Sequence, residues 1–170
     1  MTTLEIKKYP DPILRQKCQE IEDINDGILK LIAEMKKILT EADGAGLAAP
    51  QVGVTKRIIV IQTEDGPQAF INPKIISKSK EVETMDEGCL SMPGIRLNIK
   101  RAKEISVEAL EMDGKVLQIE AKDIKAKIFQ HEIDHLDGIL FIDRLSFFQR
   151  LKMKNKLEAG NEAGKKILKS

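Results

Sequence analysis

A stripe of apolar residues recurs every three or four positions across residues 24–42, and this spacing predicts an amphipathic helix. The stripe consists of Ile24, Ile28, Leu31, Ile32, Met35, Ile38 and Leu39. Gly44 and Gly46 follow it closely. Glycine adopts the left-handed backbone conformation without steric cost, so helices readily end at this residue. We therefore expect this helix to end at the glycines.

Shorter runs of apolar and β-branched residues come next and predict strands. These runs cover residues 57–62, 69–72, 74–83, 105–111 and 115–121. Between them, Ile95, Leu97 and Ile99 alternate with polar neighbours, as expected of a strand with one buried face. The last two runs are joined through Met112-Asp113-Gly114, which is typical of a hairpin turn.

Helical spacing returns after residue 121. Asp123 is expected to cap a helix that Gly138 ends, with one face formed by Ile124, Ile128, His131 and His135. A last helix is predicted from Ser146, because Gln149 stands three residues further on in a capping-box pattern. Together these elements predict an α+β fold, with residues 146–170 as a basic C-terminal helix and tail.

The pentapeptide His131-Glu132-Ile133-Asp134-His135 contains both histidines of the chain. On a helix, residues four apart lie on one face, so both imidazoles can reach one metal ion. Glu132 projects beside them, where a carboxylate can act as general base on a metal-bound water. The pentapeptide therefore indicates a metal-dependent hydrolase.

Such a site needs a third protein ligand, and the sequence offers several. In the metzincin pattern a glycine and a histidine follow, but Phe141 stands where the histidine should be. A thermolysin-like glutamate would have to be Glu158 or Glu162, in the lysine-rich tail. Cys89 is a better candidate, because thiolate binds zinc and iron(II) strongly and the surrounding segment resembles a strand. Cys18 has no neighbouring motif and is expected to be a small buried apolar residue.

Residues 44–53, 87–91 and 130–138 read GAGLAAPQVG, EGCLS and QHEIDHLDG. In this order they resemble the G-x-G-L-A-A-x-Q, E-G-C-L-S and Q-H-E-x-D-H signatures of peptide deformylases. One H-E-x-x-H motif arises readily by chance, whereas three matches in one order across residues 44–138 do not. The length of 170 residues and the C-terminal helix also agree with this family.

The resemblance implies a fold in which antiparallel sheets surround a central metal-binding helix. It implies Cys89, His131 and His135 as metal ligands, with water in the fourth position. The implied ion is one Fe(II) per chain, although zinc, nickel or cobalt also suit a Cys/His/His set.

The resemblance also implies the reaction, which removes the N-formyl group from the initiator methionine of newly made polypeptides and releases formate. Metal-bound water would attack the formyl carbon, and Glu132 would take the water proton and return it to the departing amine. The side-chain amide of Gln51 and the backbone N–H of Leu90 would stabilise the oxyanion.

The remaining implied residues bind the substrate. The strip that pairs with the peptide main chain contains Gly44, Ala45 and Gly46, and Gly88 is a further substrate-binding candidate. The family usually has a β-branched residue where Ala45 stands, so substrate packing is expected to differ there. Arg96 matches a family arginine near the mouth of the site, or forms a surface ion pair; Met85 and Ile128 are candidates for the methionine pocket, or belong to the core.

The charge composition restricts the partners that the protein can bind. The chain carries a formal net charge of +1, so the whole molecule is not an electrostatic binder of nucleic acid. Residues 150–170 contain seven Lys/Arg and two Asp/Glu, a local charge of +5. This basic segment is either a solvated helix face or, following the resemblance, a contact with ribosomal RNA.

No stretch approaches the ~20 apolar residues of a transmembrane helix, and the N-terminus lacks the pattern of a signal peptide. Two cysteines provide no disulfide framework. We therefore expect a single catalytic domain over residues 1–170, located in the cytoplasm without membrane attachment. Two other hypotheses remain: a zinc endopeptidase, and a non-catalytic ribosome-associated protein with a structural metal.

Overall fold

The computed structural model describes residues 4–153 and 155 and contains two antiparallel sheets. The larger sheet has the strand order β1-β2-β3-β6-β7. Its strands are β1 (Gly46–Ala48), β2 (Ile58–Thr63), β3 (Gly66–Lys78), β6 (Glu104–Leu110) and β7 (Val116–Lys122). The smaller sheet is a hairpin of β4 (Val82–Cys89) and β5 (Met92–Ala102).

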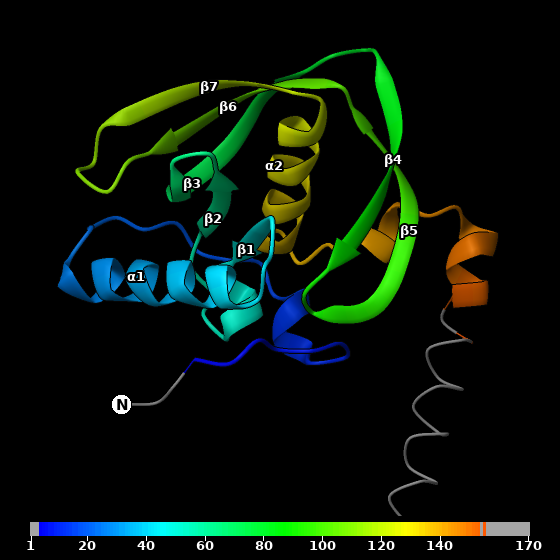
Figure 1. Cartoon of the computed structure of the whole chain (residues 1–170), viewed down its shortest axis with the longest axis horizontal. Coiled ribbons are helices and arrows are strands. Elements are labelled where there is room, and N and C mark those ends of the chain that lie inside the picture. Colours follow the sequence, from blue (N-terminus) through cyan, green and yellow to red (C-terminus); the bar gives the residue numbers. More distant parts are fainter. Residues whose placement is uncertain (1–3, 154, 156–170) are drawn as a thin grey trace, which may run out of the picture.

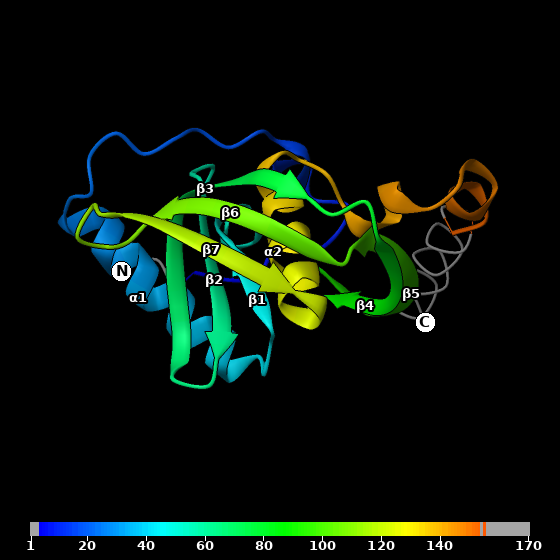
Figure 2. The same ribbon diagram turned by 90° about the horizontal axis from the view of Figure 1, so that it is seen from above.

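Two long helices accompany the sheets, α1 (Asp26–Glu41) and α2 (Asp123–Leu136). Three 3₁₀ turns are also present: η1 (Pro12–Arg15), η2 (Ala49–Val52) and η3 (Phe141–Arg144). Figure 1 shows α2 between the larger sheet and the β4–β5 hairpin. Seen from above, α1 and the hairpin lie at opposite ends with α2 between them (Figure 2). The predicted α+β fold, with antiparallel sheets around a metal-binding helix, is confirmed.

Strand β2 is buried on both faces, which explains its uninterrupted apolar run. Ile59 and Ile61 pack with α2 and the strands near it, whereas Ile58 and Val60 pack with α1. The two cores therefore share one sheet. A third core joins the β4–β5 hairpin to η1 and η3.

The apolar stripe at residues 24–42 forms α1, with Asn25 as N-cap: its side chain accepts hydrogen bonds from Gly27 N and Ile28 N. The helix end differs from the prediction. The left-handed residue is Asp43, with φ 50°, rather than a glycine. The amides of Asp43 and Gly44 bond the carbonyls of Thr40 and Leu39, which is the Schellman arrangement. Aspartate tolerates this conformation better than most residues, so glycine was not required.

The strand predictions need one correction. The predicted runs 69–72 and 74–83 meet in the single strand β3, which ends at Lys78. The Asn72-Pro73 step, read as a break, is an irregularity in the pairing of β3 with β6. Asn72 has φ 50°, and its side chain bonds both backbone groups of Ile21 at 2.8 Å. The short strand β1 within the Gly44–Gly53 segment was not predicted as a strand.

Helix α2 ends as predicted but begins differently. Asp123 does not cap it: the N-cap is Lys122, with no capping hydrogen bond from its side chain. Asp123 instead has φ 51°, and its amide bonds the carbonyl of Lys103, so the chain turns sharply out of β7. At the other end Gly138 has φ 71°, as expected of a glycine after a helix.

The predicted start of the last helix is confirmed. Gln149 N donates to Ser146 Oγ, and Gln149 Oε1 accepts from Ser146 N at 3.1 Å, forming the capping box. Residues 147–153 and 155 are helical. The rest of the predicted basic helix and tail, residues 154 and 156–170, lies outside the described residues. Within the described part of the chain, every helix is too short or too polar to cross a membrane.

Candidate active site

A cavity of about 540 Å³ opens between the strip 43–46, the end of β4 and the exposed flank of α2. The two faces of α2 have different roles. Phe129, Ile133 and Leu136 pack into the core against the larger sheet. Of the face predicted from Ile124, Ile128, His131 and His135, the first three line the cavity, whereas His135 is buried beneath it. The helical spacing of that stripe therefore reflects the site, although Ile128 also packs against the core.

Cys89, His131 and His135 come together as the sequence predicted. Their ligand atoms all lie within 4.8 Å of one another. Cys89 Sγ lies 3.3 Å from His135 Nε2, close to the separation of about 3.5 Å between two ligands of one tetrahedral ion. The residues therefore fit a divalent metal in their donor atoms and their spacing. Phe141, at the metzincin position, packs its ring against His131 with centroids 5.8 Å apart.

Glu87 orients the first histidine. Its Oε2 lies 2.9 Å from His131 Nδ1, which leaves Nε2 of this ring as the ligand atom. Arg101 donates to both oxygens of Glu87, from Nε at 2.8 Å and from Nη2 at 3.0 Å. Burial opposes ionisation of Glu87, but the hydrogen bonds from Arg101 and His131 outweigh it and lower the pKa of Glu87 to about 2. Glu87 is therefore a carboxylate at neutral pH.

The two histidines differ in their electrostatic surroundings. Burial disfavours the His131 imidazolium, but hydrogen bonds with Cys89 and Glu87 outweigh it and raise the pKa of His131 to about 10. Burial and the charge of His131 lower the pKa of His135 well below its ordinary value. His135 is therefore neutral, which is the form that binds a metal, and a metal ion replaces the proton that His131 holds.

Glu132 lies buried between the ligands and packs against Gly46. A Cβ on Gly46 would come within 2.4 Å of Glu132 Oε1, so only glycine leaves room for this carboxylate. Within residues 4–153 and 155, Glu132 Oε2 is one of two buried side-chain atoms that lack a hydrogen-bond partner; the other is His135 Nδ1. Burial raises the pKa of Glu132 to about 7. The carboxyl group can therefore gain or lose a proton near neutral pH.

Gln51 is held with its amide directed at the cysteine. Its Oε1 accepts from Ala48 N at 2.8 Å, which fixes the orientation of the amide. Its Nε2 donates to Ser91 Oγ at 3.2 Å and to Cys89 Sγ at 3.5 Å. Leu90 lines the same cavity, and its carbonyl accepts from Lys8 Nζ at 2.6 Å. One of the two donors predicted to act on an oxyanion, Gln51 Nε2, therefore lies beside a ligand, and Leu90 lines the same cavity.

The predicted substrate residues line the cavity, with the exception of Met85. Most of them line the cavity: Gly44, Ala45, Gly46, Gly88, Arg96 and Ile128. Arg96 is also paired with Asp86 through its Nε and Nη2, and both side chains are more than half exposed. Met85 is not part of the lining; it pairs with Ile99 across the β4–β5 hairpin.

Four polar residues that support the site were not given roles from the sequence. Glu87, Gln130 and Asp134 stand inside the quoted motifs, so their positions were visible but their partners were not. Gln130 bonds Ala102 N and Ala102 O and so attaches α2 to the end of β5. Arg101 has no motif around it in the sequence, and only the folded hairpin brings it to Glu87.

A Cys/His/His set, a buried carboxylate beside it and an open cavity define the class of protein, a metal-dependent hydrolase. The model of one protein family, described as polypeptide deformylase, matches residues 3–151. A peptide deformylase of Thermodesulfovibrio yellowstonii is 45% identical over 163 residues, covering 93% of this chain and 98% of that protein. One of Clostridium botulinum is 44% identical over 145 residues, covering 85% of this chain and 97% of that protein.

Solved structures agree. The crystal structure of a peptide deformylase from Thermotoga maritima matches with a TM-score of 0.82 and 39% identity, covering 86% of this chain and 99% of that one. A plant peptide deformylase, PDF1B, matches with a TM-score of 0.89 and 35% identity, covering 98% of this chain and 93% of that one. The chain therefore belongs to the polypeptide deformylase family. Its activity is that of a peptide deformylase, with the metal site at Cys89, His131 and His135.

Proposed function

We propose that Glu132 is the general base and acid of the reaction. The observation that carries this proposal is its buried carboxylate, placed between the two histidines, with Oε2 free of any other described partner. Cys89, His131 and His135 would hold a divalent metal, which would act as a Lewis acid and lower the pKa of bound water to about 7. Glu132 then takes the proton of the attacking water at Oε2 and returns it to the departing amine nitrogen.

The substitution Glu132→Gln tests this role. Glutamine keeps the size of the side chain but cannot take up a proton, so we expect kcat to fall by about 10²–10⁴-fold. The bound metal and the KM for a formyl-methionyl peptide should change little. Turnover close to the parent rate would refute the role, whereas loss of the metal would mean that the variant disturbs the ligands.

For the oxyanion, the proposal assigns Gln51 and the backbone N–H of Leu90. Support comes from the orientation of Gln51, whose Oε1 is occupied by Ala48 N while Nε2 is directed at Cys89. An amide donates without titrating, so the donor is present across the working pH range. Gln51→Glu retains the acceptor for Ala48 N and removes the donor, and we expect kcat to fall about a hundredfold.

Formyl-methionyl nascent peptides are the proposed substrates. The strip Gly44–Gly46 and Gly88 all line the cavity, so an extended peptide bound there could pair with their backbone groups. Ile128 offers an apolar wall for the methionine side chain. Met85 is kept as a candidate for this pocket only through its position on β4, while Arg96, at the rim beside Asp86, could bind a peptide carbonyl.

The native ion is proposed to be Fe(II), one per chain, with zinc, nickel or cobalt as substitutes. The thiolate and imidazole donors suit all four metals. Metal analysis of protein purified without oxygen tests this assignment. Iron near one equivalent is the expected result, and zinc in its place would overturn it.

We further propose that the protein works in the cytoplasm on chains leaving the ribosome. The basic charge of residues 150–170, part of which lies outside the described residues, supports a contact with ribosomal RNA. Replacing Lys152, Lys154 and Lys156 by glutamate should weaken co-sedimentation with ribosomes and leave turnover of free peptides intact. Unchanged co-sedimentation would refute the contact.

A further inference from the structure

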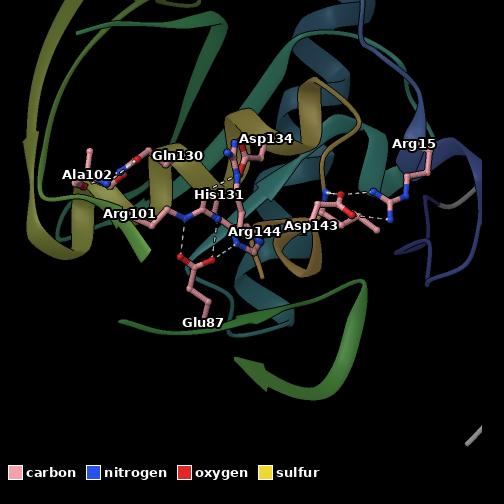
Figure 3. A network of polar contacts seen from close by, with 11 residues as sticks. Arg15, Glu87, Arg101, Ala102, Gln130, His131, Asp134, Asp143 and Arg144 are labelled. Carbon is pink, nitrogen blue, oxygen red and sulfur yellow. Dashed lines mark hydrogen bonds and ion pairs between the residues drawn. The ribbon is translucent and has the colours of Figure 1, made fainter. Parts of the chain in front are cut away.

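Asp134 lies between two arginines that come from separate parts of the chain (Figure 3). Arg101 on β5 donates from Nη1 to Asp134 Oδ2 at 2.6 Å. Arg144 in η3 donates from Nε to the same oxygen at 3.0 Å and from Nη2 to Oδ1. Asp134 stands one residue before the ligand His135, but it does not line the active-site cavity, and its carboxylate bonds these two arginines.

These contacts continue without interruption to the other histidine. Arg101 also holds both oxygens of Glu87, and Glu87 Oε2 holds His131 Nδ1 at 2.9 Å. The chain of contacts runs from Arg144 through Asp134, Arg101 and Glu87 to the metal ligand. Its inner side chains are buried, with exposed fractions of 4% for Arg101 and 2% for Glu87. Charges in such surroundings are weakly screened.

With a metal bound and His131 neutral, the charges in this cluster balance only when Arg144 is counted. Glu87 and Asp134 contribute two negative charges, and Arg101 and Arg144 contribute two positive charges. Without Arg144, two buried carboxylates would compete for the single guanidinium of Arg101. Because Arg101 fixes the orientation of Glu87, this competition would weaken the hydrogen bond between Glu87 and His131.

We propose that Arg144 is a positioning residue for the metal ligand His131, acting through Asp134, Arg101 and Glu87. Arg144 neutralises the charge of Asp134, so Arg101 remains bonded to both oxygens of Glu87. Glu87 in turn keeps the His131 ring in its metal-binding orientation. This inference rests on the proposed role of the Cys89, His131 and His135 set as ligands, but not on any step of the hydrolysis.

Arg144→Leu tests the inference in the cobalt-loaded enzyme. We expect cobalt affinity to fall about tenfold, measured as faster release to a chelator, because partners behind a histidine ligand typically contribute that much. The visible absorption bands of bound cobalt should also shift, since they report ligand geometry. Both readouts are independent of turnover, so they remain informative even if no formyl peptide is hydrolysed.

A second substitution separates charge balance from simple docking of η3. Asp134→Asn removes the charge that Arg144 neutralises but keeps an acceptor oxygen for Arg101. In the double variant Asp134→Asn/Arg144→Leu, the cluster is again neutral. We expect cobalt affinity and absorption to return toward those of the parent. If Arg144 only anchors η3 through Asp134, the double variant should instead resemble Arg144→Leu alone, because both substitutions break the same pair.

Arg15→Leu is the matched control. Arg15 pairs with Asp143, the neighbour of Arg144 in the same turn, and its side chain is 41% exposed (Figure 3). The substitution removes an arginine–aspartate pair from η3 without touching Asp134. Its cobalt spectrum and release rate should match the parent.

Each possible outcome either supports or overturns the proposal. A parent-like spectrum and release rate in Arg144→Leu would overturn the proposal, as would a double variant no better than the single one. If Arg144→Leu does not fold, Arg144→Lys and Arg144→Ala replace it. The lysine variant keeps the positive charge, so it should retain the parent spectrum, and a spectrum shifted as far as in Arg144→Ala would contradict the charge-balance account.

Discussion

Gly46 determines where the Glu132 carboxylate can lie. At the residue scale the site depends on this contact, because the ideal Cβ of any other residue would lie 2.4 Å from Glu132 Oε1 and 2.7 Å from its Cγ. These atoms belong to the end of a side chain, but that side chain is buried and cannot move away freely. The close approach of Gly46 to helix α2 is therefore part of the catalytic geometry proposed for Glu132.

Gly46→Ala should lower kcat about a hundredfold while the metal stays bound, because a displacement of ~1 Å at a catalytic group can cost this much. Steady-state kinetics and metal content measure the two effects. Gly27→Ala is the control, since its Cβ would meet only Asn25 Oδ1 at 3.1 Å, in the first turn of α1. Parent-like turnover by Gly46→Ala would show that Glu132 does not depend on this contact.

Cys18 gives a prediction for alkaline pH. Its side chain is buried, and burial raises the pKa of the thiol from 9.0 to about 11. The folded state therefore keeps a proton that the unfolded state loses. The resulting stability is fully present below pH 9 and is lost as the pH rises from 9 to 11. The loss amounts to at most about 3 kcal/mol, since one pKa unit corresponds to about 1.4 kcal/mol.

Urea unfolding of the parent and of Cys18→Ala between about pH 8 and pH 11 measures this effect. The other ionisable groups are the same in both proteins, so their contributions cancel in the difference. The advantage of the parent should shrink above about pH 9. A difference in stability that stays constant over this range would contradict the assigned pKa.

At this scale, the sequence predicted the residues whose positions follow from local spacing or from a short motif. The pair His131 and His135 is set by helical spacing, and Cys89 by a motif. Glu87 and Arg101 were missed, because 14 residues separate them and only the β4–β5 pairing brings their side chains together. Asp134 and Arg144 were missed for the same reason, since η3 has to fold back onto α2.

At the scale of elements, the stripe of Ile124, Ile128 and His131 marks the cavity face of α2, while Phe129, Ile133 and Leu136 face the core. Periodicity locates a helix but does not say which of two apolar faces meets protein and which meets a ligand. The break predicted between residues 72 and 74 was also wrong, because β3 continues through it. Asn72-Pro73 has the composition of a turn, yet the strand passes through it because the Asn72 side chain bonds the Ile21 backbone.

The end of α2 is fixed by a backbone contact that forbids any side chain. Gly138 has φ 71°, and a Cβ there would lie 2.4 Å from the carbonyl oxygen of Arg15. Gly114, in the β6–β7 turn, has a similar φ of 84° with nothing within 4 Å. Substitution of Gly114 therefore reports the cost of the left-handed backbone alone, and substitution of Gly138 adds the cost of a steric clash.

Gly114→Ala should lower the free energy of unfolding by about 1 kcal/mol, from the left-handed conformation alone. Gly138→Ala should cost about 1–3 kcal/mol more, because the backbone of Arg15 or of the helix end has to move. Urea denaturation measures both values. Equal losses would mean that the N-terminal segment yields to the new methyl group without cost.

At the scale of the whole molecule, the metal site joins parts that otherwise pack separately. Cys89 comes from the β4–β5 hairpin, whereas both histidines come from α2. A bound ion therefore ties the smaller sheet to the central helix. Because only the folded chain assembles these three ligands, binding stabilises the fold by mass action.

Removal of the metal should lower the thermal midpoint. An ion at about 100 times its Kd contributes about 2.7 kcal/mol, which corresponds to roughly 5–10 °C for a chain of this size. Calorimetry with and without a chelator measures the difference. Glu132→Ala should retain the full shift, and Cys89→Ala should lose most of it. A chelator effect that persists in Cys89→Ala would place the ion elsewhere.

The most direct test of the central claim is formate release from a formyl-methionyl peptide by protein prepared without oxygen. The account predicts that the parent releases formate and leaves the peptide bonds intact, while Glu132→Ala retains the metal and releases almost none. Cleavage of peptide bonds without formate would instead indicate an endopeptidase. Equal formate release by the parent and Glu132→Ala would contradict the site described for this chain.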